Sequence, residues 1–150
     1  MVTAEAVTPV VDEIIALFNK KAMDLPDGFF DRKTQFVLNG APFETLLGQP
    51  PADPLVLMLT RGPAGYRFAC KGLQHAMPDA ALERGEITAL ADDRITARVW
   101  LSGHLRTTGE ALDTIITVVL RFAAAGWVEV AEATVEREAL DRLRVARLEP

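Results

Sequence analysis

The sequence predicts an α+β fold in which a long, highly curved antiparallel or mixed sheet is covered on its concave face by helices. Two observations support this prediction. Residues 92–134 contain no proline and show the alternation of long strands joined by two tight turns. Two amphipathic helical patterns precede these strands in the chain. Because long strands bend and need a cover on the concave side, we expect one cone-shaped domain over residues 1–150, with a pocket inside.

The first helix is expected to begin at Thr8, with Pro9 at the first helical position, and to end near Met23. A second helix is expected to begin at Gly62-Pro63 and to stop before Pro78. Both have an apolar stripe at helical spacing, which in the first helix includes Val7, Val10, Val11, Ile14 and Phe18. These stripes predict the helix faces that cover the sheet.

The segment between the helices predicts a small hairpin at residues 34–46, because Asn39-Gly40 is a strong two-residue turn signal. Pro42 would confine the second strand of this hairpin to a sheet edge. Phe29–Arg32 is expected to form a short helical turn, and a short apolar helix is expected to start at Asp53-Pro54.

Four strands are expected to form the large sheet, at residues 86–90, 94–102, 111–122 and 127–134. They alternate between apolar and polar residues or are rich in β-branched residues. The charged segment 136–148, which has few large apolar groups, is expected to form a short helix on the surface.

The net charge of −5 and the pI near 5.0 argue against nucleic acid and anionic membranes as partners, because no basic stripe offsets the acidity. No apolar run approaches the roughly 20 residues of a membrane span. No signal peptide is visible at the N-terminus, so we expect a cytoplasmic location. The single Cys70 excludes an internal disulfide, and two histidines on separate elements give little support for a metal site. Neither a metal nor another cofactor is expected.

Four short motifs between residues 61 and 134 occur in an order found in a known superfamily. They are Arg61-Gly62-Pro63 with the helix end Gly72–Asp79 (GLQHAMPD), Asp93–Arg98 (DRITAR) followed by Ser102-Gly103-His104, Thr108-Gly109-Glu110, and Leu120-Arg121-Phe122 with Gly126 and Glu129. In these motifs the chain resembles the NTF2-like superfamily, and more specifically its SnoaL-like, polyketide-cyclase-like proteins. The resemblance implies a cone-shaped NTF2-like roll and an isomerase, cyclase or lyase acting on an apolar substrate.

The chain departs from this resemblance where steroid-isomerase-like members carry their catalytic groups. The place of their tyrosine in the first helix is similar to that of Ile14, and the place of their strand acid is similar to that of Val118. Residues 36–39 offer no carboxylate where those members have an aspartate. A hydrogen-bonding pair for an enolate is therefore not evident at these positions.

The wall of the expected pocket follows from alternation along residues 111–122. If Phe122 faces inward, every second residue before it does too, and this apolar wall either packs as core or contacts a ligand. Tyr66 could donate a hydrogen bond into the pocket, while Trp100 either stacks on a flat ligand or packs under the C-terminal segment. The residues expected to bind the substrate are Phe18, Tyr66, Trp100, Leu112, Ile116, Val118, Leu120, Glu129 and Ala131.

Asp113 and His104 are the candidate catalytic residues. SnoaL-like cyclases carry an acid–base aspartate close to the position of Asp113, which the resemblance therefore makes a candidate for moving a substrate proton. Strict alternation places Asp113 on the face opposite Phe122, so only a β-bulge would bring it into the cone. His104 matches the histidine of a family motif and either orients a substrate carbonyl at the pocket mouth or bonds to local backbone in a turn.

Two functions from different classes remain open. One is a small-molecule enzyme of isomerase, cyclase or lyase type, and the other is a non-catalytic ligand-binding or dimerisation module with the same cavity. An enzyme requires at least two polar groups within reach of one point in the pocket. The outer face of residues 111–122 is also apolar at Ile115, Thr117 and Val119, which predicts a homodimer through that face. The expected partners are therefore a small apolar molecule and a second copy of the chain.

Overall fold

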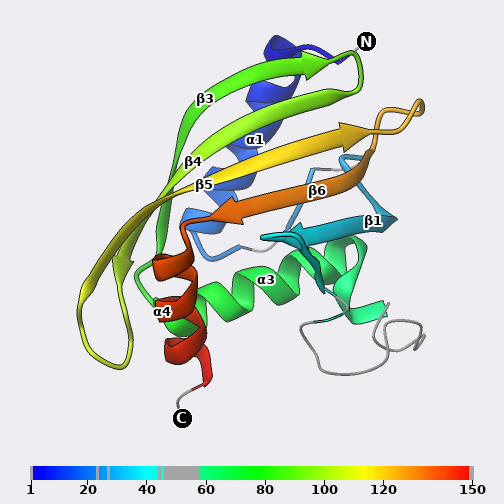
Figure 1. Ribbon diagram of the computed structural model, residues 1–150. Helices are drawn as coiled ribbons and strands as arrows, with labels where there is room; N and C mark the ends of the chain where they lie inside the picture. Colours follow the sequence, from blue (N-terminus) through cyan, green and yellow to red (C-terminus); the bar gives the residue numbers. More distant parts are fainter. Residues whose placement is uncertain (1, 23, 27, 44, 46–57, 149–150) are drawn as a thin grey trace.

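A curved sheet organises the chain, and its strands run in the order β2-β1-β6-β5-β4-β3 (Figure 1). The computed structural model describes residues 2–22, 24–26, 28–43, 45 and 58–148. Strands β1 and β6 are parallel, and all other neighbouring strands of this sheet are antiparallel. The expected α+β class with a mixed sheet is therefore confirmed. The elements are α1 (Ala4–Asn19), β1 (Phe30–Leu38), β2 (Ala41–Pro42), α3 (Gly62–Ala76), β3 (Ala81–Ala91), β4 (Arg94–His104), β5 (Ala111–Phe122), β6 (Val128–Val135) and α4 (Arg137–Leu148).

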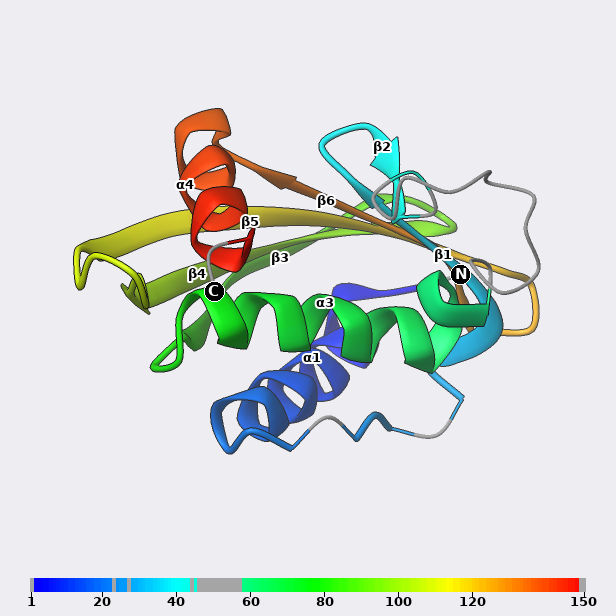
Figure 2. The same ribbon diagram turned by 90° about the horizontal axis from the view of Figure 1, so that it is seen from below.

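Helices α1 and α3 lie on the same side of the sheet, and α4 lies at one end of it (Figure 2). Helix α1 packs against β3 and α3 packs against β1, near opposite edges of the sheet. Gly62 lets α3 begin close to β1, because it has φ +63° and a Cβ there would lie 2.7 Å from the Cα of Arg32. The helices thus attach at the two sides and span the curved middle strands.

Helix α1 begins five residues before the expected start and ends before the expected end. Its N-cap is Thr3, whose Oγ1 accepts a 3.2 Å hydrogen bond from the backbone N–H of Ala6. Pro9 therefore lies inside the helix, where its missing N–H leaves the Glu5 carbonyl without its usual donor. The helix ends at Asn19 because Lys21 takes a left-handed conformation, with φ 61°. The prediction of both ends was wrong.

The Asn39-Gly40 turn joins β1 to β2 as expected, with φ 48° at Asn39 and 82° at Gly40. Two positive φ values are the geometry of a type I′ hairpin turn. The short helical turn expected at Phe29–Arg32 is wrong, because Phe30 already pairs with Val128 of β6 and its ring packs edge-on against Phe36. The apolar helix expected from Asp53-Pro54 lies mostly outside the described residues.

Strands β3 to β6 form an antiparallel meander, and β5 has the expected bounds. Strands β4 and β5 pair without a break from Arg94↔Arg121 to His104↔Ala111. Strand β3 begins at Ala81 rather than at Glu86. Near Gly85 it contains an extra residue, which shifts the pairing between Arg84↔Val99 and Ile87↔Ala97. That shift interrupts the alternation that marks a strand in sequence, which explains why its first half was missed.

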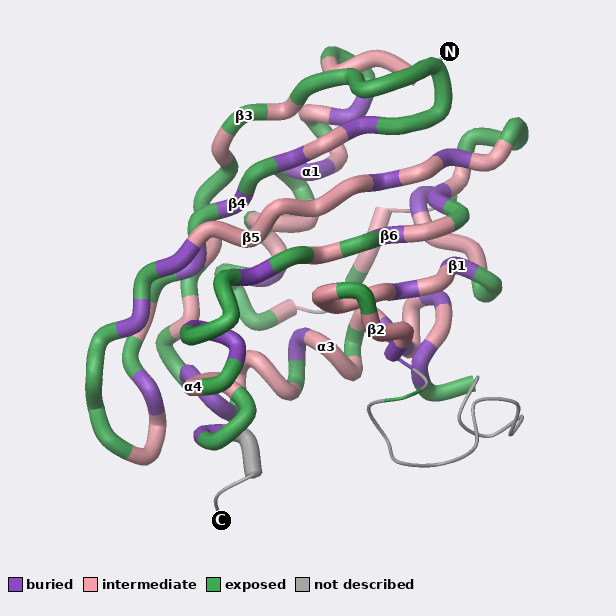
Figure 3. The backbone as a smooth tube through the Cα atoms, viewed as in Figure 1, coloured by how far each residue is buried: buried purple, intermediate pink, exposed green. Residues whose placement is uncertain are grey.

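Two clusters of buried apolar residues form the core. Figure 3 shows where buried residues lie along the chain. The larger cluster joins α1, β1 and the middle of the sheet. The second cluster includes Ala139, Leu140 and Ala146, so α4 is an integral part of the core. The expectation of a helix lying merely on the surface was wrong, because two of these contacts come from alanines, whose small size hid the buried face.

Candidate functional site: two cavities under the curved sheet

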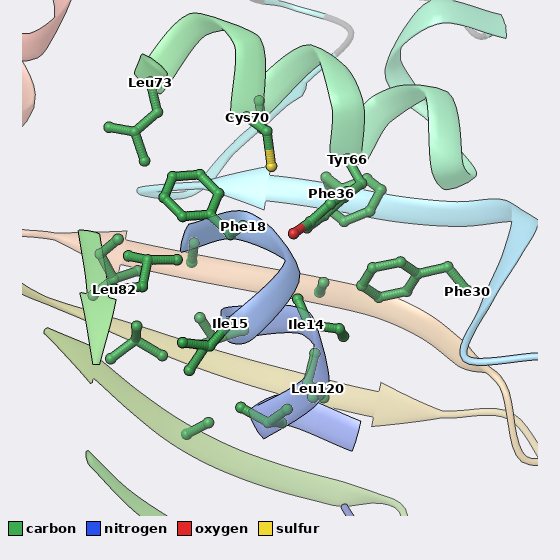
Figure 4. A pocket seen from close by; sticks show the side chains of 18 of the residues that line it. Ile14, Ile15, Phe18, Phe30, Phe36, Tyr66, Cys70, Leu73, Leu82 and Leu120 are labelled. Atoms are coloured by element: carbon green, nitrogen blue, oxygen red, sulfur yellow. The ribbon is translucent and has the colours of Figure 1, made fainter. Parts of the chain in front are cut away.

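A cavity of about 240 Å³ lies between α1, α3 and the concave face of the sheet; it is called the first cavity below. The hollow exists because three of the inward positions on β4 and β6 are alanines, namely Ala97, Ala131 and Ala133, which do not reach the helices. Larger apolar side chains surround it (Figure 4). They include Ile14, Ile15, Phe18, Phe30, Phe36, Leu73, Leu82 and Leu120.

Tyr66 and Cys70 supply the polar side-chain atoms of this wall. They are one helical turn apart on α3, and their hydroxyl and thiol groups point into the cavity and share a hydrogen bond (Figure 4). Burial, reinforced by Cys70, raises the pKa of Tyr66 well above its ordinary value. Burial likewise raises the pKa of Cys70 to about 11, although the hydrogen bond from Tyr66 opposes this change. Both groups are therefore neutral near pH 7, and Tyr66 is a hydrogen-bond donor.

Six of the residues expected to bind the substrate line the first cavity. Alternation along β5 correctly places Ile116 and Val118 on the concave face. Leu112 shares that face but lies beyond the cavity, buried in the second cluster. The six lining residues are Phe18, Tyr66, Ile116, Val118, Leu120 and Ala131.

Trp100 and Glu129 lie outside the cavity. Trp100 is 50% exposed on the convex face of the sheet, opposite Ile115 of β5. Glu129 is exposed and forms a 3.5 Å ion pair with Arg121. It points outward because β6 has an extra residue between the pairs Phe122↔Val128 and Arg121↔Val130, which breaks the expected parity with Ala131.

The two candidate catalytic residues also lie away from the cavity wall. Asp113 is exposed on the convex face, where it pairs with Ser102 of β4, and no bulge in β5 turns it inward. His104 ends β4, and its Nδ1 lies 2.6 Å from Oδ2 of Asp79. Its backbone N–H donates to the other oxygen of Asp79 at 2.7 Å. These hydrogen bonds from His104 lower the pKa of Asp79, so the structure shows this histidine holding the turn before β3.

A second cavity of about 240 Å³ lies between α3, α4 and the sheet. It was not predicted, because its wall depends on the packing of α4 that the sequence pattern did not show. A usable signal was the helical spacing of Phe68, Gly72 and Ala76 on α3, where two small residues leave room. Five residues line both cavities: Phe43, Ala69, Leu73, Ile116 and Ala133.

The described part of the chain holds no cluster of three or more His, Cys, Asp or Glu residues arranged to bind a metal ion. Among the helices that the structure describes, none combines the length and apolarity that crossing a membrane requires.

No protein-family model matches the sequence, and no curated protein matches it. The structure, however, is similar to several solved structures. One is a candidate isomerase from Bacillus subtilis, with a TM-score of 0.67 and 15% identity, covering 97% of this chain and 97% of that one. Another is AclR, a candidate hydroxylase from Streptomyces galilaeus, with a TM-score of 0.64 and 18% identity, covering 99% and 87%.

A third similar structure is a candidate SnoaL-like polyketide cyclase from Jannaschia sp. CCS1, with a TM-score of 0.60 and 13% identity over 95% of this chain and 94% of that one. Identities this low bear on the fold and leave the chemistry open. Together with the sheet order, the helical cover and the hollow beneath the curved strands, these likenesses show that the chain has an NTF2-like fold.

Proposed function

We propose that the chain binds an apolar small molecule that carries an oxygen acceptor, with the apolar part in the first cavity and the oxygen at Tyr66. The observation that carries this proposal is the composition of the wall, in which a neutral hydroxyl and a neutral thiol face an otherwise apolar hollow. Such a site favours ligands through burial, at about 0.8 kcal/mol for each methylene group. When the Tyr66 O–H turns from the Cys70 sulfur to the ligand oxygen, this one donor fixes the orientation of the ligand.

The experiment compares a neutral cyclic ketone, cyclododecanone, with the matching hydrocarbon, using displacement of the neutral dye Nile red. The ketone should bind more tightly to the wild-type protein, and Tyr66→Phe should remove this preference. One neutral hydrogen bond contributes about 0.5–1.5 kcal/mol, so the expected loss is roughly 2- to 12-fold in affinity.

Val118→Phe tests where the ligand binds. Val118 lines the first cavity but not the second, and a phenylalanine ring at this position would fill the first cavity. It should abolish ketone binding, while the more conservative Val118→Leu should weaken it less. Glu132→Gln is the matched surface control, because its side chain is exposed on the other face of the sheet. An unchanged affinity in Val118→Phe, or no binding to the wild-type protein, would overturn the proposal.

A second candidate is an enzyme of isomerase, cyclase or lyase type that acts on the same ligand. It is supported by the descriptions of similar structures as a candidate isomerase and a candidate polyketide cyclase. Such chemistry requires a proton acceptor, yet among the described lining residues none is a carboxylate or an imidazole. Binding is therefore ranked first. If a substrate is found, loss of turnover in Asp113→Asn or His104→Ala would reverse this order.

We also propose that a second copy of the chain covers the convex face of β4 and β5. In the single chain this face carries the half-exposed Trp100 beside Ile115. Asp113 and Arg121 lie at opposite ends of β5, with Thr117 midway between them. A two-fold axis across β5 at Thr117 would therefore place Asp113 of each copy opposite Arg121 of the other, which is a self-complementary arrangement of charge.

Charge reversal tests this dimer by sedimentation velocity. Asp113→Arg and Arg121→Asp should each weaken the dimer at least tenfold, and the double variant should restore it. Glu5→Arg, on α1 and away from this face, is the control. A monomeric wild-type protein, or single variants that dimerise normally, would contradict the proposed interface. The cytoplasmic location expected from the sequence stays a prediction.

A further inference from the structure

The two cavities are separated by a single layer of side chains. Leu73 of α3, Ile116 of β5 and the buried Phe43 line both of them, together with the smaller Ala69 and Ala133. Leu73 and Ile116 are only partly buried, and each of them borders both cavities. Side chains bordered by voids on both sides can change rotamer with little steric resistance. Leu73 and Ile116 are therefore the side chains of this boundary that we expect a ligand to displace.

The volumes of the two cavities also indicate that together they form one site. Each cavity measures about 240 Å³. Pockets that bind small molecules usually measure about 300–1,000 Å³, so each cavity alone is small, whereas the two joined fall within that range. Their wall follows α3 from Tyr66 to Ala76, a length of roughly 15 Å at the rise of an α-helix. The combined space is elongated rather than round.

The two ends of this space differ in charge. Among the described residues that line either cavity, Arg144 of α4 is the one with a charge, and it is exposed at the border of the second cavity. Arg137 and Arg142 of the same helix have carboxylate partners, Asp141 at 4.0 Å and Glu110 at 3.2 Å. Within the described part of the chain no carboxylate pairs with Arg144. The apolar space thus ends at a guanidinium that is available to an anion.

We propose that the two cavities form one elongated site for a long-chain aliphatic carboxylic acid, with the carboxylate at Arg144 and the chain extending past Leu73 and Ile116 into the first cavity. This inference rests on the proposed binding of an apolar molecule in the first cavity, and it specifies the class of that molecule. An apolar tunnel selects the chain by burial, and a single arginine at its open end selects the acid over uncharged analogues.

Isothermal titration with dodecanoic acid and dodecanol tests the role of the charge, because the two probes have the same chain. The wild-type protein should bind the acid at least tenfold more tightly than the alcohol. Arg144→Gln should remove this difference while leaving the affinity for the alcohol unchanged. Arg137→Gln, on the same helix but paired with Asp141, is the matched control and should behave as the wild-type protein does.

Filling one cavity at a time tests whether the site is continuous. Leu143 lines only the second cavity, and Val118 lines only the first. Leu143→Trp should weaken the binding of dodecanoic acid at least tenfold. It should leave the affinity for cyclododecanone unchanged, because that ligand needs only the first cavity. Val118→Phe should weaken both. Thermal unfolding of each variant establishes that it is folded, and Leu143→Phe replaces Leu143→Trp if the larger ring prevents folding.

The outcomes separate the two proposals. Equal binding of acid and alcohol to the wild-type protein, or an unchanged preference in Arg144→Gln, would overturn the anionic head-group site while binding of cyclododecanone still supports the first cavity. An unchanged affinity for dodecanoic acid in Leu143→Trp would show that the cavities act separately. Absence of binding by cyclododecanone and by both twelve-carbon probes would overturn the proposed function itself.

Discussion

Cys70 illustrates how the apolar cavity controls the chemistry of a single residue. Its pKa of about 11, against an ordinary value of 9.0, follows from burial. At pH 8 the thiolate fraction should therefore be about 100-fold lower in the native protein than in the unfolded chain. Reaction with a disulfide reagent should be slower than in urea by at least that factor, and its rate should rise with pH toward 11. Equal native and unfolded rates would contradict this prediction.

Asp79 provides a prediction of pH dependence. Hydrogen bonds from His104 lower its pKa in the folded protein. The stabilisation is thus fully present above the ordinary value of 3.8 and is lost as pH falls through the lower folded value. Urea midpoints of Asp79→Asn and wild type should differ at pH 5 and converge as the pH falls through the lowered pKa of Asp79. The same change at Asp92, on the β3–β4 turn, is the control, and a gap that persists in acid would contradict the assignment.

At the scale of residues, strand alternation predicted most of the cavity wall. It succeeded for Ile116 and Val118 because β5 pairs with β4 without a break. It failed for Glu129 because a bulge in β6 depends on the neighbouring strand, which no pattern within β6 reveals. For Asp113, strand alternation correctly predicted a position on the convex face of the sheet. Only the family resemblance suggested that this residue acts inside the cavity.

Helix α1 shows, at the scale of an element, how a helix start can lie away from a strong local signal. The sequence favoured Thr8 as the N-cap, whereas the structure uses Thr3, next to a 2.9 Å hydrogen bond from Val2 N–H to the Asp92 carbonyl. Thr3→Ala should therefore lower the free energy of unfolding by about 1 kcal/mol. Thr8→Ala, a matched change inside the helix, should have little effect. Equal effects in chemical denaturation would contradict the assigned start of the helix.

Asn39 joins the hairpin turn to the end of β6. Its side chain accepts from Val135 N–H at 2.8 Å and donates to the Val135 carbonyl at 2.9 Å, so it continues the pairing where β1 ends. Asn39→Gly keeps the positive φ that the turn needs but removes both bonds. It should destabilise the protein by about 1–3 kcal/mol, because Val135 N–H would lose its acceptor. A stability equal to that of wild type in urea titration would contradict this role.

For the whole molecule, the meander and its helical cover could be predicted because their signals are local: alternation, turns and apolar stripes. The parallel pairing of β1 with β6 is different, since it joins segments such as Thr34 and Val128, 94 residues apart. The second cavity also depends on long-range packing, that of α4 against α3. Local patterns therefore predicted the cone and its first cavity, while the second cavity beside α4 required the structure.

The parallel pair β1–β6 has a consequence for the order of folding. Strands β3 to β6 are joined by short connections and can pair early, whereas β1 must close a much longer loop. Phe36, on β1, is part of the cavity wall, so the binding site is complete only after this late step. A ligand would then act mainly on the native state and slow the unfolding rate, leaving the refolding rate nearly unchanged.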